Sequence, residues 1–482
     1  MSIRDLLTKE LSEVAPLIAS GEVSPVELTQ ATLDLIHELN PVTRSYTNVL
    51  DEIALTEAKA AEKEIASGAY RGALHGIPYS IKETLATKGI PSTAGSVILK
   101  DYLPDYDSTV GSRTREAGGV LLGKANLHEW ASGGTNDNPH FGRAGNSWAM
   151  DRIPGGSSGG SAAAVSLGMG YFSYGTDGAG SVRMPAGFCG VVGIKGTYAL
   201  LSRYGMIPPV GPGQDHGPGI LARSIRDAAA IMNAIVGRDT RDPASFAYDA
   251  PDYLAALEKD VRGMRIGIPT NYYFELIDPE VEAAVRSAIA VLAGLGVEFE
   301  DVHIPYIEEA MAVSYVGNVS EFHKAHLRVQ REDYGDDLRY RFMAQEFVLA
   351  KDAARAAKVR DIFKASMQQV VSKYDALIAP TTCLPAYPFD ADEVQIGDSS
   401  VDIKAAGVAS EILVRLTRPA NIACIPAVSV PCGLTSGGLP IGLQIMVRPL
   451  SETTVFALGH QYGTATGQAV SAVPPIVAAE LA

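Results

Sequence analysis

The pattern of apolar and polar residues changes along the chain, and each change predicts a different local architecture. Residues 1–70 are predicted to be helical. Ser24 and Glu27 have the spacing of a helix-capping box, Pro25 suits the first helical position, and apolar residues at helical spacing continue to Leu35. After Gly68, short apolar runs broken by glycine take over, which is typical of strands buried on both faces. These runs are 76–82, 118–126, 168–177 and 189–196.

Helical stretches lie between these runs, at 161–167 and 225–236. The alternation predicts an α/β fold with a mixed, mostly parallel central sheet covered by helices on both faces. Strand texture continues in the second half of the chain, around a helix at 281–292 and a long helical block at 306–371. The predicted strands there are 264–269, 297–305, 376–380, 427–431 and 442–447.

The domain organisation follows from these textures. Residues 1–70 are expected to pack as helices on the core, and residues 71–240 to form that core. Residues 241–482 are expected to complete the same α/β domain. Because strand runs flank the block 306–371, we expect it to be a helical insertion that caps the sheet and forms part of a pocket.

Composition narrows the class of protein. The chain has 482 residues, 46% of them hydrophobic and 20% charged, which suits a large buried core. Its net charge of −15 argues against nucleic-acid binding, which needs clustered basic residues. No run of 18 apolar residues and no secretory leader is visible, so we expect a cytoplasmic protein without a membrane span. The four cysteines lack metal-ligand spacing and are expected to be free thiols, at positions 189, 383, 424 and 432.

The densest chemical signal lies in residues 154–197. There the run Gly155-Gly156-Ser157-Ser158-Gly159-Gly160 is followed by the small-residue cluster Gly178-Ala179-Gly180-Ser181. Glycine lets the backbone approach a ligand closely, and successive free N–H groups in such a loop can stabilise an oxyanion. The segment therefore predicts a loop that binds a reacting carbonyl group.

This segment resembles the amidase signature family of serine hydrolases. The motifs that carry the resemblance are GGSSGGS, GTD-x-x-GS-x-R-x-P and FCGVVG-x-K, together with the upstream lysine segment GIPYSIKE (76–83). The resemblance extends through most of residues 20–465 and is weakest in 306–371. In this sequence alanine replaces the first of two glycines that usually precede the nucleophile, at Ala179.

The resemblance implies a catalytic triad of Lys82, Ser157 and Ser181, in which Ser181 is the nucleophile and Ser157 relays its proton to Lys82. Lysine can accept that proton only when it is neutral, so its pKa must fall well below about 10.4. The implied oxyanion donors are the N–H groups of Gly178, Ala179, Gly180 and Ser181, and the implied bracing residues are Ser158, Asp177 and Arg183. The family needs no metal and no organic cofactor, because water completes the turnover.

The resemblance also implies hydrolysis of a C–N bond in a small-molecule amide, anilide or carbamate, by a free-standing monomer or homodimer. The pocket is expected to be lined from 128–135, 204–216, 306–371 and 418–426, where aromatic and aliphatic residues suggest a hydrophobic or aryl substrate. The candidate pocket residues are Trp130, Gly133, Gly134, Tyr204, Met206, His216, Tyr315 and Cys424.

Three alternatives remain open at this point. Residues 155–159 also match the G-x-S-x-G elbow of a Ser-His-Asp esterase, for which His216 or His460 would be the histidine. The spacing from Gly118 to Lys124 imitates a phosphate-binding loop, although alanine follows the lysine. Finally, SRYG (202–205) favours the amidase component of a tRNA-dependent amidotransferase complex, whereas His-Glu-Trp at 128–130 favours a free-standing amidase.

Overall fold

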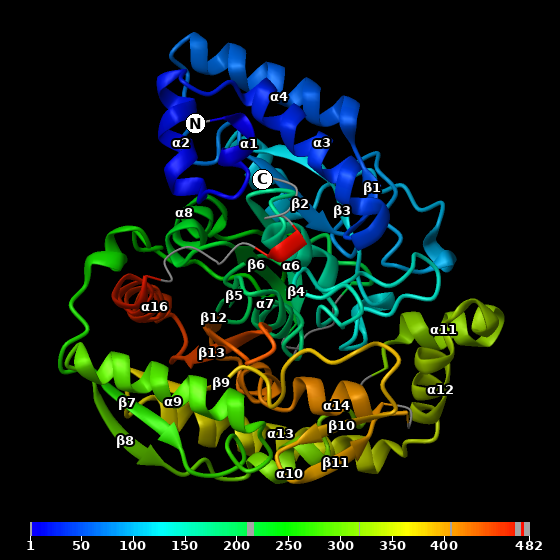
Figure 1. Ribbon diagram of the computed structural model, residues 1–482. Helices are drawn as coiled ribbons and strands as arrows, with labels where there is room; N and C mark the ends of the chain where they lie inside the picture. The colour runs from blue at the N-terminus through cyan, green and yellow to red at the C-terminus, as the bar shows by residue number, and fades with distance from the viewer. Residues whose placement is uncertain (1, 210–215, 318, 405–406, 468–473, 477–482) are drawn as a thin grey trace.

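The computed structural model describes residues 2–209, 216–317, 319–404, 407–467 and 474–476 (Figure 1). Its α-helices are α1 (Ile3–Leu6), α2 (Leu11–Ser20), α3 (Pro25–Thr43), α4 (Asp51–Ala66), α5 (Thr109–Glu116), α6 (Gly159–Ser166), α7 (Arg183–Cys189), α8 (Ile225–Ile235), α9 (Pro279–Gly294), α10 (Ile307–Ala312), α11 (Glu321–Gln330), α12 (Asp336–Gln345), α13 (Ala350–Val371), α14 (Val408–Val414), α15 (Arg418–Ile422) and α16 (Glu452–Thr466). Its strands are β1 (Tyr46–Val49), β2 (Pro78–Lys82), β3 (Val120–Ala125), β4 (Phe172–Asp177), β5 (Val192–Lys195), β6 (Gly217–Ala222), β7 (Arg265–Pro269), β8 (Glu298–Val302), β9 (Ala376–Pro380), β10 (Glu393–Ile396), β11 (Ser399–Asp402), β12 (Ala427–Leu434) and β13 (Pro440–Met446).

One large sheet runs through the molecule, with the strand order β1-β3-β2-β4-β6-β5-β12-β13-β9-β7-β8. The predicted mixed sheet is therefore confirmed. Within the described residues, parallel pairing is confined to two blocks of three strands, β3-β2-β4 and β9-β7-β8. The other six neighbouring pairs are antiparallel. The tight β12–β13 hairpin explains part of this, because a short turn can join only antiparallel strands.

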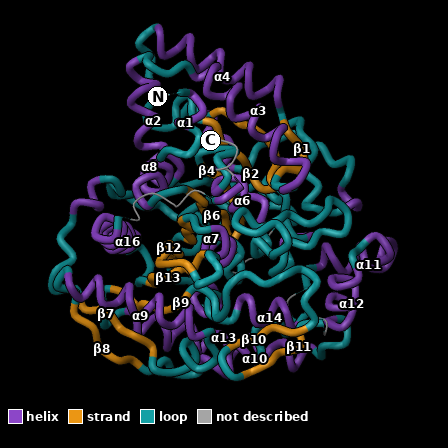
Figure 2. The backbone as a smooth tube through the Cα atoms, in the orientation of Figure 1, coloured by secondary structure: helices purple, strands orange, loops and turns teal. Residues whose placement is uncertain are grey.

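Helices cover both faces of the sheet, as expected. In β12, Ser429 lies against α7 and the next residue, Val430, lies against α16. Successive side chains of a strand point to opposite faces, so α7 and α16 lie on opposite sides of the sheet. The helix α6 packs beside α7, whereas α8 and α9 pack beside α16. Figure 2 shows the strands enclosed between these helices.

The N-terminal helices pack over the β1 end of the sheet (Figure 1). Ser24 caps α3 as predicted, because its side chain accepts a hydrogen bond from the backbone N–H of Glu27 and Pro25 is the first helical residue. Residues 1–70 are not wholly helical, since they also contribute the edge strand β1. Asn40 fixes that strand by accepting a 2.8 Å hydrogen bond from the N–H of Tyr46.

The block 306–371 is helical, as predicted, and forms α10 to α13. The helices α11 and α12 lie at the periphery of the molecule in Figure 1, while α13 lies in the lower part of the view and packs against α10 and α15. Apolar residues of α11 and α12 pack against Trp130, which attaches the outer part of the block to the glycine-rich half of the chain. None of the described helices is long and apolar enough to cross a membrane.

Candidate active site

Lys82 and Thr176 come from neighbouring strands that end at the same edge of the sheet. Lys82 is the last residue of β2, and Thr176 stands one residue before the end of β4. The two strands are parallel and adjacent in register, so their carboxyl ends lie together. This is the edge where parallel α/β sheets usually bind their ligands.

The amino group of Lys82 lies inside a shell of hydroxyl groups. Its Nζ is 2.7 Å from Oγ of Ser157, 2.8 Å from Oγ of Ser158 and 3.0 Å from Oγ1 of Thr176. The side chain is fully buried, and it forms no ion pair with any described carboxylate. Thr176 was not among the predicted site residues, although it stands inside the GTD motif.

Burial decides the protonation state of this lysine. Desolvation holds the pKa of Lys82 well below the usual value for lysine, although the negative charge of Asp177 opposes the shift. A neutral amine has two N–H donors and one lone pair. It can therefore donate to Ser158 and Thr176 while it accepts the hydroxyl proton of Ser157, so the three contacts fit a lysine that acts as a base.

Ser181 lies at the wall of the adjoining cavity. The residue is 7% exposed, in contrast to the fully buried Ser157. The backbone N–H of Ser158 donates a 3.2 Å hydrogen bond to the carbonyl of Ser181, which joins the two serine loops. The peptide bond between Gly156 and Ser157 is cis. The structure thus brings the three residues of the predicted triad to one place, with Ser181 on the side that a substrate can reach.

The loop before Ser181 offers fewer free N–H groups than predicted. The N–H of Gly180 donates a 2.8 Å hydrogen bond to Oδ1 of Asp177. It is therefore not free to bind an oxyanion, which corrects the prediction for this residue. In the described part of the chain the N–H groups of Gly178, Ala179 and Ser181 have no such partner. Gly180 has φ +120°, and a Cβ at this position would lie 1.9 Å from Oγ1 of Thr417, so the residue must be glycine.

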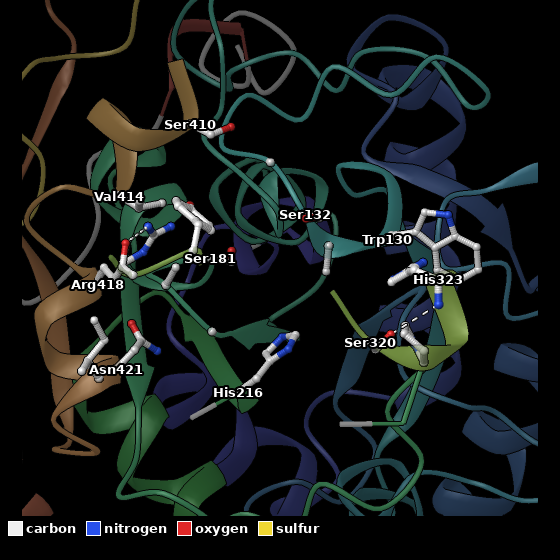
Figure 3. Close-up of a pocket in the computed structure, with 18 of the residues that line it drawn as sticks. Trp130, Ser132, Ser181, His216, Ser320, His323, Ser410, Val414, Arg418 and Asn421 are labelled. Atoms are coloured by element: carbon white, nitrogen blue, oxygen red, sulfur yellow. Dashed lines mark hydrogen bonds between the residues drawn. The ribbon is translucent and has the colours of Figure 1, made fainter. Parts of the chain in front are cut away.

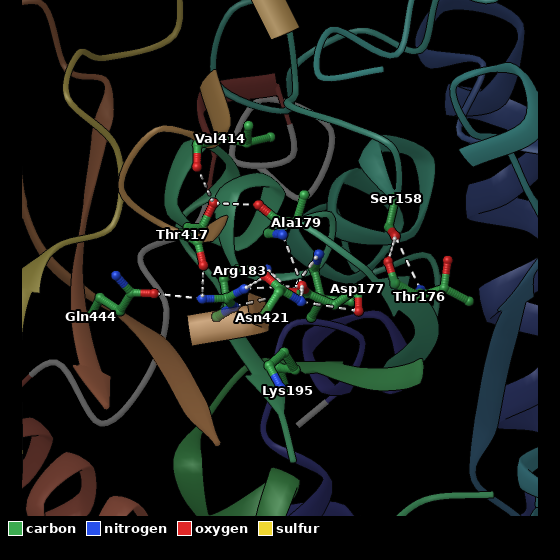
Figure 4. Close-up of polar contacts among 12 residues, drawn as sticks. Ser158, Thr176, Asp177, Ala179, Arg183, Lys195, Val414, Thr417, Asn421 and Gln444 are labelled. Atoms are coloured by element: carbon green, nitrogen blue, oxygen red, sulfur yellow. Dashed lines mark hydrogen bonds and ion pairs between the residues drawn. The ribbon is translucent and has the colours of Figure 1, made fainter. Parts of the chain in front are cut away.

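Asp177 and Arg183 form a buried ion pair that holds this loop (Figure 4). Both side chains are completely buried, and Nη2 of Arg183 is 3.0 Å from Oδ1 of Asp177. Although burial works to raise it, the pKa of Asp177 is held far below its usual range by the charge and hydrogen bonds of Arg183.

The same guanidinium reaches the C-terminal third of the chain. Nη1 of Arg183 is 2.6 Å from the side-chain oxygen of Gln444, and Nη2 is 2.6 Å from that of Asn421. In addition, the hydroxyl of Thr417 donates a 2.7 Å hydrogen bond to the carbonyl of Ala179. The loop that carries Ser181 is therefore fixed from both halves of the chain.

A cavity of about 390 Å³ opens in front of Ser181 (Figure 3). All four predicted segments contribute to it, and seven of the eight candidate pocket residues line it. These seven are Trp130, Gly133, Gly134, Met206, His216, Tyr315 and Cys424.

The eighth candidate, Tyr204, is not a pocket residue. Its ring packs against Tyr106, with ring centroids 5.3 Å apart, and Arg241 stacks on it at 4.3 Å. These contacts hold the side chain elsewhere, so the prediction was wrong for this residue. The position of a tyrosine in a loop does not determine where its ring points. Met206, two residues further along, does line the cavity.

The charged residues that line the cavity were not predicted from the sequence. Along α13 the wall is formed by residues 357, 360, 361 and 364, which share one helical face. The cationic residues of the wall are Arg341, Arg360, Lys364 and Arg418, and the acidic one is Asp361. The spacing of three, one and three positions between these residues is visible in the sequence. It was not a usable signal, because charged residues on helices are usually exposed to solvent.

The esterase and phosphate-loop alternatives do not fit. No described strand leads into Gly155, as the nucleophile elbow requires, and His460 lies beside Arg226, away from the cavity. His216 does line the cavity, yet no hydrogen bond joins it to Ser157 or Ser181 in the described residues; burial lowers its pKa to about 4. Lys124 is buried in β3 and bonds to the carbonyl of Leu85.

Metal-ligating side chains do not cluster at the site. Across the ranges that the structure describes, no three His, Cys, Asp or Glu side chains gather as metal ligands would.

Comparison with known proteins places this geometry in a family. The family model described as Amidase matches residues 27–456. The glutamyl-tRNA(Gln) amidotransferase subunit of Carboxydothermus hydrogenoformans is 35% identical over 489 residues, which cover 96% of this chain and 97% of the relative.

Solved structures agree with this placement. A protein from a vestigial complex, linked to the origins of an s-triazine catabolic enzyme, has a TM-score of 0.89 and 30% identity and covers 96% of this chain and all of its own. A bacterial aryl acylamidase of the amidase signature enzymes has a TM-score of 0.84 and 29% identity, with 96% of this chain and 98% of its own covered.

Proposed function

The chain belongs to the amidase signature family, whose members hydrolyse C–N bonds, and on that premise we propose that it cleaves a small-molecule amide through an acyl-enzyme on Ser181. The observation that carries the proposal is the buried amino group of Lys82, which contacts hydroxyl groups and lacks a described carboxylate partner. A serine hydroxyl is a weak nucleophile until a base removes its proton, and a neutral lysine can supply that base.

In this mechanism Ser181 attacks the amide carbonyl while its proton passes through the Ser157 hydroxyl to Nζ of Lys82. The negative charge on the former carbonyl oxygen is stabilised by the N–H groups of Gly178, Ala179 and Ser181. Lys82 then returns the proton through Ser157 to the departing nitrogen, and the C–N bond breaks. A water molecule then attacks the acyl-enzyme and gives a proton through Ser157 to Lys82, and Lys82 returns a proton to Oγ of Ser181 as its bond to the acyl group breaks and the acid is released.

The residues around the triad orient the Lys82 amine and hold the loop that carries the N–H donors. Ser158 and Thr176 accept hydrogen bonds from Lys82 and so direct its lone pair toward Ser157. Asp177 and Arg183 fix the loop on which the N–H donors stand. In this way the ion pair supports catalysis without contacting the substrate.

A panel of primary amides, anilides, carbamates and matched esters tests the proposal directly. We expect amide hydrolysis, together with an acyl adduct on Ser181 when the reaction is quenched in acid and digested for mass spectrometry. An adduct on another residue, or amide hydrolysis that survives Ser181→Ala, would count against the mechanism.

A second candidate function uses the same chemistry within a complex. The curated relative named above belongs to an amidotransferase, and its 35% identity across 96% of this chain supports a role within a complex more directly than a free-standing one. The likeness to an aryl acylamidase, at a TM-score of 0.84, supports the free-standing enzyme and an anilide or carbamate substrate. Trp130 and Tyr315 in the cavity wall fit such an aryl group.

The two candidates predict different behaviour of the purified chain. A free-standing amidase hydrolyses its amide alone at full rate. For a component of an amidotransferase complex, we expect efficient amide hydrolysis only when the other components of the complex are added. Full turnover of an anilide or carbamate by the isolated chain would exclude the amidotransferase role.

A further inference from the structure

Arg418 is a buried cation in the wall of the catalytic cavity. It is the first residue of α15, and its neighbour Thr417 bonds to the carbonyl of Ala179 in the nucleophile loop. Arg418 is only 6% exposed and lines the same cavity as Ser181. Both side chains are drawn in the pocket close-up of Figure 3.

The guanidinium of Arg418 is only partly satisfied by the protein. Nη1 donates a 2.7 Å hydrogen bond to Oγ of Ser314, and the guanidinium carbon lies 3.3 Å from the ring centroid of Tyr315. Nη2 is buried and has no hydrogen-bond partner among the described residues. No described carboxylate forms an ion pair with this arginine. Buried charges in folded proteins are normally paired, so this donor lacks the partner that its environment demands.

The other cations of the wall differ from Arg418. Arg341 forms an ion pair with Asp337 at 2.8 Å. Arg360 donates to the backbone carbonyls of Val313 and Val316. The wall as a whole carries four cationic side chains against one carboxylate, so it favours an anionic group in the cavity. Although burial lowers the pKa of Arg418 to about 9, the group remains protonated at neutral pH.

We propose that Arg418 binds a carboxylate of the substrate, so that the amides this enzyme hydrolyses are those that carry a carboxylate near the scissile carbonyl. A guanidinium presents paired N–H groups that match the two oxygens of a carboxylate. Ser181 and Arg418 both line the cavity, and its volume of about 390 Å³ suits a small-molecule substrate. This inference rests on the proposed amidase function.

The ring of Tyr315 already contacts the guanidinium of Arg418. Tyr315 also lines the cavity, so a carboxylate that binds at Nη2 lies close to this ring. A ligand carboxylate would form charge-assisted hydrogen bonds with the guanidinium, which are about twice as strong as those between neutral groups.

Two pairs of amides test the proposal on the wild-type enzyme. One pair is succinyl 4-nitroanilide and its methyl ester, with the carboxylate on the acyl side. The other is 4-acetamidobenzoate and its methyl ester, with the carboxylate on the leaving group. We expect kcat/KM of the acid to exceed that of its ester by about tenfold or more in one pair. Equal values within both pairs overturn the proposal and leave water as the partner of Nη2.

Variants assign the preference to this residue. Arg418→Met should lower the acid-to-ester ratio of kcat/KM by about tenfold to a hundredfold, and Arg418→Lys should restore part of it because it keeps the charge. The matched control is Arg286→Gln, an arginine on the exposed face of α9 that stacks on Phe274 and lies outside the cavity. An unchanged ratio in Arg418→Met also overturns the proposal. The wild-type comparison stands by itself when a variant does not fold.

A binding measurement separates this proposal from the hydrolase function. Calorimetry with the two acids on Ser181→Ala should show binding that weakens by about tenfold or more in Ser181→Ala/Arg418→Met. Binding of the acids without hydrolysis by the wild type would support the carboxylate site and contradict the hydrolase function. Hydrolysis of acid and ester at equal rates would support the hydrolase function and contradict the carboxylate site.

Discussion

The Nζ atom of Lys82 lies 2.7 Å from Oγ of Ser157. The carbonyl of Ser181, the third member of the proposed triad, accepts a hydrogen bond from the N–H of Ser158, which follows Ser157 in the chain. The lysine is fully buried, whereas Ser181 reaches the cavity. In the proposed mechanism the base is thus shielded from water, while the nucleophile is accessible to the substrate.

Ser181→Ala should abolish amide hydrolysis and leave the fold intact, because a small side chain at a loop position leaves little space when it is trimmed. Intact-protein and peptide mass spectrometry after treatment with a fluorophosphonate should find one adduct, on Ser181, in the wild type and none in the variant. Ser112→Ala, on helix α5 and outside the cavity lining, is the control and should keep the adduct. An adduct on Ser157 or Ser158 would reassign the nucleophile.

Lys82→Ala should reduce amide hydrolysis more than ester hydrolysis. An amine leaves only after it receives a proton, whereas a phenoxide leaves without one, and general acid–base help is worth about 10²–10⁴-fold. Matched 4-nitroanilide and 4-nitrophenyl ester substrates measure the difference. Equal losses on the two substrates would mean that Lys82 acts through structure alone.

The activity of the wild type should rise with pH and then level off. Only the neutral form of Lys82 accepts a proton, and burial holds its pKa well below the usual lysine value. Therefore kcat/KM increases as pH rises through that lowered pKa and is constant above it. A profile between pH 5 and 10 checks this, and a rising limb centred near the ordinary lysine pKa of about 10.4 would contradict it.

Asp177→Asn should destabilise the protein by about 3–5 kcal/mol, since it leaves the buried guanidinium of Arg183 without its counter-charge. Urea unfolding measures the loss. The control is Glu282→Gln, which removes an exposed ion pair to Arg286 on α9 and should cost less than about 1 kcal/mol. Similar losses for the two substitutions would show that the buried pair contributes no more than a surface pair.

Tyr315→Ala should change the ranking of large against small amides by about 1–3 kcal/mol in kcat/KM, because its ring lines the cavity. Tyr204→Ala is the matched control: its ring packs on Tyr106 and Arg241, so it should lower stability without changing the ranking. Both variants should react with a small fluorophosphonate at rates near that of the wild type. A common slowing of all substrates in Tyr315→Ala would mean that the residue only supports the fold.

Much of the sheet was predictable because most of its strands are buried on both faces and are rich in apolar residues. The predicted strand 376–380 coincides with β9, and 264–269 begins one residue before β7. β1 was missed because only Tyr46 of its four residues is buried, so it lacks that signature. Parallel pairing was overstated, since texture reveals a buried strand but not the direction of its neighbour.

The residues of the proposed triad stand in recognisable motifs, whereas the charged residues of the cavity wall do not. Lys82, Ser157 and Ser181 stand in segments whose glycine pattern is distinctive. Arg360 and Arg418 carry no such mark, because a charged residue on a helix is usually exposed and only tertiary packing turns it inward. The engagement of Gly180 with Asp177 likewise depends on how the loop folds back on itself.

The bonds from Arg183 to Asn421 and Gln444 have a consequence for biosynthesis. They join residues that lie 238 and 261 positions apart in the chain. A polypeptide that has emerged from the ribosome only as far as α13 already contains the lysine and both serines. It still lacks the partners that orient the loop before Ser181. We therefore expect the growing chain to have no hydrolase activity until its last strands are translated and packed into the sheet.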